Sequence, residues 1–259
     1  DRWRRDGETR ALEMAARTLD AIAAGGIHDH VGGGFHRYAT DPDWRTPHFE
    51  KMLYNQAQIA RAMVEGWQAT GRAEWRRAAE RCFDYVLRDM TDPEGAFFAA
   101  EDADSPGADG RPEEGAFYAW PRGAVEAALG AEAGWAIETL GLDARPRIEA
   151  GPVPHLAPGA EVDFDRLDPL LEQLREAREA RPRPVRDGKV IAGWNGLMIR
   201  ALAEAALAFG APAHARAAAR AGEAVWRRLW DGERLARLWA GGAPHEAGLL
   251  EDHAWLGLG

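Results

Sequence analysis

Apolar residues recur along most of the chain at the three- and four-residue spacing of amphipathic helices. In the clearest case, Leu53, Ala57, Ala60 and Val64 fall on one face of a helix predicted over residues 49–70. The same periodicity predicts further helices over residues 8–24, 73–90, 163–180, 191–209, 213–230 and from 249 to the end. The chain is therefore expected to be all-α, with few strands.

Strand patterns are short and lie between the helical segments. GAFFAA (95–100) and GAFYAW (115–120) flank a polar stretch and predict a hairpin. The stretches YVLRDMTDPEGAFFAA and RRLWDGERLARLWAGG both run from a helix through an acidic turn into an apolar strand, a weak internal repeat. The segment 142–161, rich in Pro and Gly, is expected to be a long connection within one domain.

Repeated helix pairs with short hairpins predict an α/α toroid, a ring whose inner helices line a central funnel. The predicted helices are fewer than six hairpins need. We therefore expect residues 1–259 to form part of a single toroid domain, either as an incomplete ring or as an open bundle, with short β-hairpins in the loops at the mouth. The start lacks an initiator Met, and the apolar pattern runs to the last residue, so the chain is expected to belong to a longer protein.

Composition narrows the function classes. Of 259 residues, 46% are hydrophobic, which is enough for a core, and the net charge of −10 argues against nucleic acid or an anionic membrane as the main partner. No apolar run approaches the roughly 20 residues of a membrane span, and a bacterial-type cytoplasm is the default expectation. The single cysteine, Cys82, excludes dithiol chemistry within this chain and is expected in the core.

The segment GGIHDHVGGGFHRYATDPDWRTPHFEKML (25–53) carries four of the eight histidines. His28, Asp29 and His30 are possible metal ligands, but their spacing matches no regular zinc motif. Hydrogen bonding to the backbone of a buried loop is the favoured alternative, and no metal or cofactor is expected. The run 32–34 of three glycines lacks the strand and the Lys of a phosphate loop, so a steric role is favoured.

Seven chemically capable side chains gather in the second half of this segment. They are His36, Arg37, Tyr38, Asp41, Trp44, His48 and Glu50. Aromatic rings stack on sugar faces, and Arg, Asp and His bind hydroxyls or carboxylates through several hydrogen bonds. A carboxylate beside an imidazole is also a natural acid/base pair. A functional mouth is favoured over its alternative, a capping and packing network at the junction of loop and helix.

Two further clusters follow along the chain. If extended backbone continues past GAFFAA, Glu101 and Ala103 face one way while Asp102 and Asp104 face the other. Neighbouring carboxylates suit general-acid and glycosidic chemistry, although an acidic turn is an equal alternative. In Gly-Trp-Asn-Gly (193–196), the indole is a candidate stacking ring, and the Asn is a hydroxyl partner or a helix cap.

Five blocks, in order along the chain, are similar to a known family. They are HDHVGGGFHRYATDPDWRTPHFEKMLYNQAQIA, YVLRDMTDPEGAFFAAEDADS, EGAFYAW, KVIAGWNGLMIRALA and LLEDHAWL. The chain thereby resembles the thioredoxin-domain-containing (spermatogenesis-associated, thioredoxin-like) family. The resemblance implies a thioredoxin-like domain followed by a six-hairpin toroid similar to N-acylglucosamine 2-epimerase, cellobiose 2-epimerase and six-hairpin glycosidases. The chain departs from that pattern because the C-x-x-C and the thioredoxin-like domain are absent, and because Asn55 and His253 replace an Asp and a Tyr.

The resemblance, joined to the residues of the mouth, predicts a carbohydrate-active protein, with sugar epimerisation or isomerisation first. His48 or Glu50 would take a proton beside a sugar carbonyl, and His36 or His30 would return it. The alternatives are a glycoside hydrolase using the acidic cluster and a non-catalytic scaffold for a thioredoxin-like domain. The expected catalytic residues are His36, His48, Glu50, Glu101, Asp102 and Asp104; those expected to bind the sugar are His30, Arg37, Tyr38, Asp41, Trp44, Trp194, Asn195 and Asp252.

Overall fold

The computed structural model describes residues 2–107, 109–157 and 161–259, and their regular structure is mainly helical. The helices are α1 (Arg2–Asp6), α2 (Thr9–Ala24), α3 (Leu53–Thr70), α4 (Ala73–Asp89), α5 (Arg122–Leu129), α6 (Ala133–Thr139), α7 (Phe164–Arg178), α8 (Ala192–Phe209), α9 (Pro212–Leu229) and α10 (Leu250–Leu258). The long helices match the periodicity of the sequence to within a few residues at their ends. None of the described helices is both long and apolar enough to cross a membrane.

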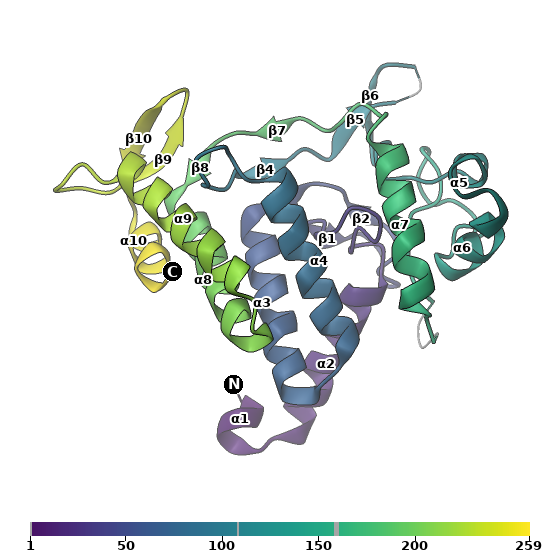
Figure 1. The fold of residues 1–259 in the computed structure, drawn as a ribbon, viewed down its shortest axis with the longest axis horizontal. Helices are drawn as coiled ribbons and strands as arrows, with labels where there is room; N and C mark the ends of the chain where they lie inside the picture. Colours follow the sequence, from purple (N-terminus) through teal and green to yellow (C-terminus); the bar gives the residue numbers. More distant parts are fainter. Residues whose placement is uncertain (1, 108, 158–160) are drawn as a thin grey trace.

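Two α-hairpins stand side by side and form the frame of the molecule (Figure 1). One is α3–α4 and the other is α8–α9, and they meet through α3 and α8. Helix α10 packs on α8, and α2 lies against α3 and α4. The row α3, α8, α10 corresponds to the inner helices of an α/α toroid, with α4 and α9 as outer helices. The fold class predicted from the sequence is confirmed.

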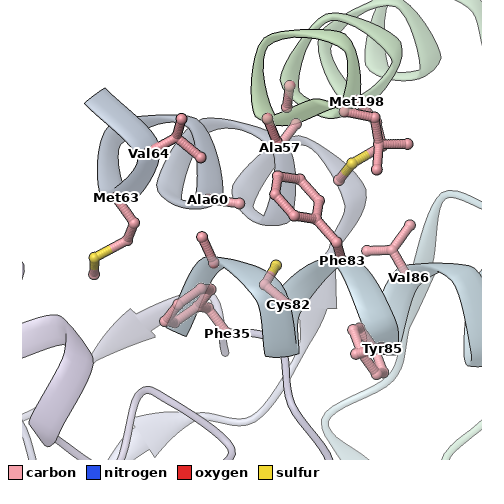
Figure 2. Packing of buried hydrophobic residues seen from close by; sticks show 14 of the residues in the cluster. Phe35, Ala57, Ala60, Met63, Val64, Cys82, Phe83, Tyr85, Val86 and Met198 are labelled. Atoms are coloured by element: carbon pink, nitrogen blue, oxygen red, sulfur yellow. The ribbon is translucent and has the colours of Figure 1, made fainter. Parts of the chain in front are cut away.

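The largest core cluster fills the space between these helices. Figure 2 shows Met198 of α8 beside Ala57 of α3 and Phe83 of α4. Cys82 lies in the same cluster without exposed surface, as predicted, and burial raises the pKa of its thiol, so it stays protonated. A second cluster joins α5, α6 and α7. Helices α5 and α6 are too short to show a clear period, and the sequence pattern did not predict them.

Short strands line the ends at which the inner helices begin. They are β1 (Tyr38–Ala39), β2 (Pro47–His48), β3 (Lys51–Met52), β4 (Ala100–Glu101), β5 (Asp104–Pro106), β6 (Pro112–Glu114), β7 (Arg186–Asp187), β8 (Val190–Ile191), β9 (Ala236–Ala240) and β10 (Ala243–Ala247). All pairs are antiparallel, in the groups β1-β2, β3-β4-β7, β5-β6 and β8-β9-β10. Because β3 leads directly into α3 and β8 into α8, the strands fix where these two inner helices start (Figure 1).

The prediction that residues 95–100 and 115–120 pair as a hairpin is wrong. Strand β4 pairs instead with β3 and β7, and the hairpin β5–β6 forms inside the intervening polar stretch. Gly115 explains the difference, since its φ of +79° turns the backbone and an added Cβ would lie 2.6 Å from the Phe49 ring. The segment after Gly115 is therefore packed as turns, with Phe117 and Tyr118 buried against Phe49.

The internal repeat seen in the sequence has a structural counterpart. After α4, Thr91 bridges to Phe97, and after α9, Trp230 bridges to Leu235. In each turn an Asp carboxylate accepts backbone N–H groups, Asp92 from residues 94–96 and Asp231 from residues 233 and 234. The α3–α4 and α8–α9 hairpins are thus each followed by a turn of the same kind. The segment 142–161 has no helix in its described part, as expected.

Candidate functional site

A buried ionic cluster anchors the loop that runs from α2 to α3. The Asp29 carboxylate receives Lys51 Nζ at 2.8 Å and the two Nη atoms of Arg178 at 2.9 and 3.0 Å. Burial alone would raise the pKa of Asp29, but Arg178 and Lys51 outweigh burial and hold it well below its usual range. Lys51 Nζ also donates to the Gly33 carbonyl at 2.9 Å. The cluster therefore ties the loop, the start of α3 and the end of α7 together.

The glycine run allows the loop to pass close to α4. Gly33 and Gly34 have φ of +82° and +77°, in the left-handed region that favours glycine. An added Cβ would overlap the Arg81 carbonyl oxygen at Gly33 and the Tyr85 ring at Gly34. The steric role predicted for this run is confirmed.

Three of the loop histidines are buried in this packing. His28 Nδ1 bonds the Ala23 carbonyl at 3.1 Å, His30 Nε2 bonds the Gly25 carbonyl at 3.1 Å, and His36 Nδ1 bonds the Phe49 carbonyl at 2.8 Å. Burial lowers the pKa of both His30 and His36 to about 3, so their rings are neutral near pH 7. The predicted backbone hydrogen bonding is confirmed. The described residues include no set of three His, Cys, Asp or Glu side chains placed to hold a metal ion.

The fourth histidine, His48, lies at the mouth between two carboxylates. Its Nδ1 is 2.6 Å from Glu114 Oε1, and its Nε2 is 3.7 Å from Glu50 Oε2. Glu50 Oε2 in turn accepts from Arg37 Nη1 at 2.7 Å. These side chains are partly exposed, so a ligand can reach them. Strands β2 and β6 supply His48 and Glu114, which brings the two long loops together.

Two aromatic rings continue this line onto the inner helices. Tyr54, in the first turn of α3, bonds the Arg37 guanidinium, and together with Glu50 it raises the pKa of Arg37. The Tyr54 ring meets the Trp194 ring of α8 edge to face, with centroids 4.9 Å apart. We use the name mouth cluster for this contiguous line, which consists of Glu114, His48, Glu50, Arg37, Tyr54 and Trp194.

The structure places the acidic stretch after β4 in two environments. Glu101 is buried and accepts from the Tyr85 hydroxyl at 2.6 Å, whereas Asp102 and Asp104 are exposed. The predicted alternation is thus confirmed. Asp104 lies opposite Glu114 in the β5–β6 hairpin, near the mouth cluster. Glu101 belongs to the interior beneath it.

Several other predicted site residues serve the backbone. Asn195 Oδ1 accepts from Phe97 N–H at 2.8 Å and its Nδ2 donates to Phe97 O at 3.0 Å, without side-chain exposure. The buried Asp252 carboxylate accepts from Gly193 N–H and Leu249 N–H at the start of α10. Neither side chain is brought into the mouth cluster. His30 and His36, buried in the loop, also lie outside it.

The hairpin tip between β1 and β2 separates the remaining candidates. Tyr38 is exposed, and its ring centroid is 5.1 Å from that of His48, so it borders the mouth cluster. Asp41 accepts backbone N–H groups within the tip, including Thr46 N–H at 2.6 Å. Trp44 lines a different cavity against α2 and α4. The sugar stacking predicted for Trp44 at the mouth therefore has no support from its position.

Two members of the mouth cluster, Glu114 and Tyr54, were not found from the sequence. Glu114 lies in a stretch predicted as a turn, and only the folded hairpin brings it to His48. Tyr54 had a signal that could have identified it, because an aromatic–Asn pair lies in the first turn of both α3 and α8, Tyr54–Asn55 and Trp194–Asn195. Asn55 Nδ2 donates to the Arg37 carbonyl at 2.7 Å.

Paired α-hairpins, with inner helices that begin beside a polar mouth, define an α/α toroid of the six-hairpin type. The structure of a UGL variant with dGlcA-Glc-Rha-Glc is similar to the chain, with a TM-score of 0.51 at 11% identity over 98% of this chain and 52% of that one. At this identity the likeness concerns the fold. No family model matches the chain.

The sequence relatives are more specific. The chain is a homologue of spermatogenesis-associated protein 20, with 36% identity to the human protein over 98% of this chain. It is also 30% identical to the uncharacterized protein B0495.5 of Caenorhabditis elegans over 88% of this chain. The chain spans 38% of the length of the human relative and 35% of the nematode one.

Proposed function

We propose that the mouth cluster is a carbohydrate site and that its first chemistry is proton transfer beside a sugar carbonyl. The observation that supports this proposal most directly is the line of contacts through the mouth cluster. It runs from Glu114 through His48, Glu50 and Arg37 to the rings of Tyr54 and Trp194. An acid/base pair, a hydroxyl-binding guanidinium and stacking rings meet there at an exposed surface. Those are the functional groups that sugar isomerisation needs.

In this proposal, His48 and Glu50 exchange the proton. In an aldose, one of them removes the proton from carbon 2, and the electron pair moves into the carbonyl to give an enediolate. A proton then returns to the opposite face of carbon 2, which gives the epimer, or to carbon 1, which leaves the carbonyl at carbon 2 and gives the ketose. Glu114 is a positioning residue, because its carboxylate bonds His48 Nδ1 and so directs Nε2 toward Glu50. Arg37 binds hydroxyls, and Trp194 provides a stacking face.

Deuterium exchange tests the proposal directly. The chain is incubated with a panel of aldoses and ketoses in deuterated water, and deuterium beside the carbonyl, at carbon 2 of an aldose or carbon 1 of a ketose, is measured by NMR. We expect exchange with at least one sugar and a loss of about 100-fold or more in Glu50→Gln. Glu126→Gln, a change on the exposed face of α5, is the control and should exchange like the parent. No deuterium with any sugar would remove the mechanism.

Glycoside hydrolysis is the second candidate, and the pair of carboxylates bordering His48 favours it. Retaining and inverting hydrolases need two carboxyl groups roughly 5–9.5 Å apart across the scissile bond. Glu50 and Glu114 would supply them in this case. Release of nitrophenol from nitrophenyl glycosides, lost in both Glu50→Gln and Glu114→Gln, would select hydrolysis over isomerisation.

A thioredoxin-like partner domain, implied by the family resemblance, defines the remaining proposal. A scaffold for such a domain would bind its client without the mouth cluster. His48→Ala would then leave client binding intact, and calorimetry would detect no sugar binding that depends on the mouth cluster. A sugar dissociation constant of millimolar or better that is weakened by His48→Ala would contradict the scaffold proposal.

A further inference from the structure

A second cavity, of about 960 Å³, lies between the end of α2, the start of α4 and the tip of the β1–β2 hairpin. No member of the mouth cluster lines it. Its walls include the rings of Trp44, Trp75 and Phe164, together with His28 and His155. This volume falls within the usual range of small-molecule sites. The cavity therefore has the size and the aromatic lining of a binding site that the mouth chemistry does not use.

Trp44 is held at this cavity in a strained conformation. Its φ is +61°, in the left-handed region that a bulky residue adopts only when the surrounding structure enforces it. Asp41 enforces the turn by accepting N–H groups of residues 43, 45 and 46. The Trp44 carbonyl accepts from Gly26 N–H at 2.7 Å, and an added Cβ at Gly25 would overlap that carbonyl oxygen. The loop thus holds one indole at the cavity at an energetic cost.

The two imidazoles at the cavity are hydrogen-bond acceptors. His28 Nδ1 and His155 Nδ1 bond the carbonyls of Ala23 and Val153, at 3.1 and 2.9 Å, and because a carbonyl only accepts, each Nδ1 carries the proton. Burial lowers the pKa of both rings, so they are neutral and each Nε2 is a bare acceptor. His28 Nε2 is closed off from solvent. The acceptor available to a ligand is therefore His155 Nε2.

The charged groups around the cavity balance one another. The lining carries four arginines and four carboxylates, whose formal charges cancel: Arg17, Arg45, Arg72, Arg77, Asp20, Asp43, Glu74 and Glu161. Arg45 is a half-buried donor without an ion pair among the described residues. A bare imidazole acceptor repels the oxygens of a carboxylate or phosphate but accepts from a hydroxyl. A hydroxyl can also accept from a guanidinium. The lining therefore suits a neutral ligand rich in hydroxyls that has one apolar face for an indole.

We propose that this cavity is a second sugar site, outside the mouth, that takes a neutral mono- or disaccharide against Trp44. The hydroxyls donate to His155 Nε2 and accept from Arg45, while the C–H face of the ring stacks on the indole. The site needs no catalytic group. It stands on its own observations and does not depend on the chemistry proposed for the mouth.

Calorimetric titration of the chain with glucose, cellobiose and glucuronate tests the proposal. We expect a neutral sugar to bind with a dissociation constant of millimolar or better, and glucuronate to bind at least about tenfold more weakly. Trp44→Gly should weaken binding of the neutral sugar at least about tenfold, and Trp194→Ala should leave a component of it unchanged. Glycine adopts φ of +61° readily, so this variant is expected to fold, which thermal unfolding checks.

Three outcomes would overturn the proposal. They are the absence of saturable binding of either neutral sugar, binding that Trp44→Gly leaves unaltered, and a preference for glucuronate. Failure of deuterium exchange at the mouth would not count among them, because the exchange assay reports on His48 and Glu50 alone. Conversely, loss of binding in Trp44→Gly with exchange intact would separate the two sites.

Discussion

At the scale of single residues, the interior beneath the mouth is organised by charge. Lys51 is fully buried, and its Nζ contacts Asp29 and lies 4.1 Å from the centroid of the Tyr85 ring. The Tyr85 hydroxyl donates to Glu101, the second buried carboxylate of this region. Removing one member of such a set leaves an opposite charge unpaired in the interior, which costs more than the net worth of the pair.

Lys51→Met is therefore predicted to lower the free energy of unfolding by about 3–5 kcal/mol. Asp29 would keep Arg178, but the buried positive charge beside Glu101 and Asp29 would be lost. Urea denaturation measures the change. Lys189→Met is the matched control, because Lys189 pairs with Asp187 at the same 2.8 Å on the surface, where a pair contributes about 0–1 kcal/mol. A similar loss in both variants would contradict the prediction.

His36 predicts an acid sensitivity of the fold. Its pKa is about 3 in the folded protein against 6.5 for an ordinary histidine, so below pH 6.5 the unfolded chain binds a proton that the folded one does not. Stability from this group is complete above pH 6.5 and falls toward pH 3, by up to about 1.4 kcal/mol per pH unit. In His36→Asn, which retains a donor for the Phe49 carbonyl, the slope of unfolding free energy against pH should be smaller by about that amount.

The comparison is made between pH 4 and 6, within the interval defined by the two pKa values. Above pH 6.5 both proteins should show the same slope, because His36 is then neutral in either state. An equal slope for the two proteins between pH 4 and 6 would mean that His36 is reached by protons in the folded state, contrary to its burial.

At the scale of elements, the path of the loop between α2 and α3 depends on Gly33, whose surroundings are more crowded than those of a glycine at an ordinary helix end. Gly33 has a positive φ, and a Cβ added there would overlap the Arg81 carbonyl oxygen. Gly71, which ends α3, has φ of +75°, but open space surrounds it. The two positions separate the conformational cost of a side chain from the steric one.

Gly33→Ala is predicted to destabilise by about 2–5 kcal/mol, the sum of a left-handed alanine and an overpacked contact with Arg81. Gly71→Ala should lose only the conformational part, about 1–2 kcal/mol. Thermal or urea unfolding of both variants checks the difference. Equal losses would show that the loop can move away from α4, and would remove the steric explanation of the glycine run.

The helices were predictable because their burial repeats locally. Leu53, Ala57, Ala60 and Val64 were placed on one helix face from spacing alone, and all four are buried. The strand pairing was not predictable, since β4 joins one partner from early in the chain, β3, and one from much later, β7. Pairing between segments so far apart in sequence leaves no periodic signal.

The candidate site was predictable only in part, for a related reason. His48, Glu50, Arg37 and Tyr38 lie in one segment whose composition identified it. The sequence could not distinguish them from His36, because burial of that ring is decided by Phe49 and Tyr118, which pack against it in the folded chain. Residue type indicated the chemistry, while the tertiary packing decided which side chains reach the surface.

At the scale of the whole molecule, the row of inner helices depends on close approach of α8 and α10. An added Cβ at Gly196 of α8 would overlap the Trp255 carbonyl of α10, which is part of the helix backbone. Asp252 adds a hydrogen bond from the start of α10 to the start of α8. The close approach of α10 to α8 thus depends on the absence of a single methyl group.

Gly196→Ala is predicted to displace α10 while leaving the α3–α4 hairpin in place. Backbone atoms cannot rotate away, so α10 must shift, and its amides should lose at least about tenfold of their hydrogen-exchange protection. Gly222→Ala is the control, because the nearest atom to its added Cβ is 4.0 Å away and alanine favours a helix by about 1 kcal/mol. Hydrogen exchange measured by mass spectrometry resolves residues 250–258 from residues 53–89. Unchanged protection of α10 in Gly196→Ala would show that the contact between α8 and α10 is adjustable, and that this glycine does not fix the spacing of the two helices.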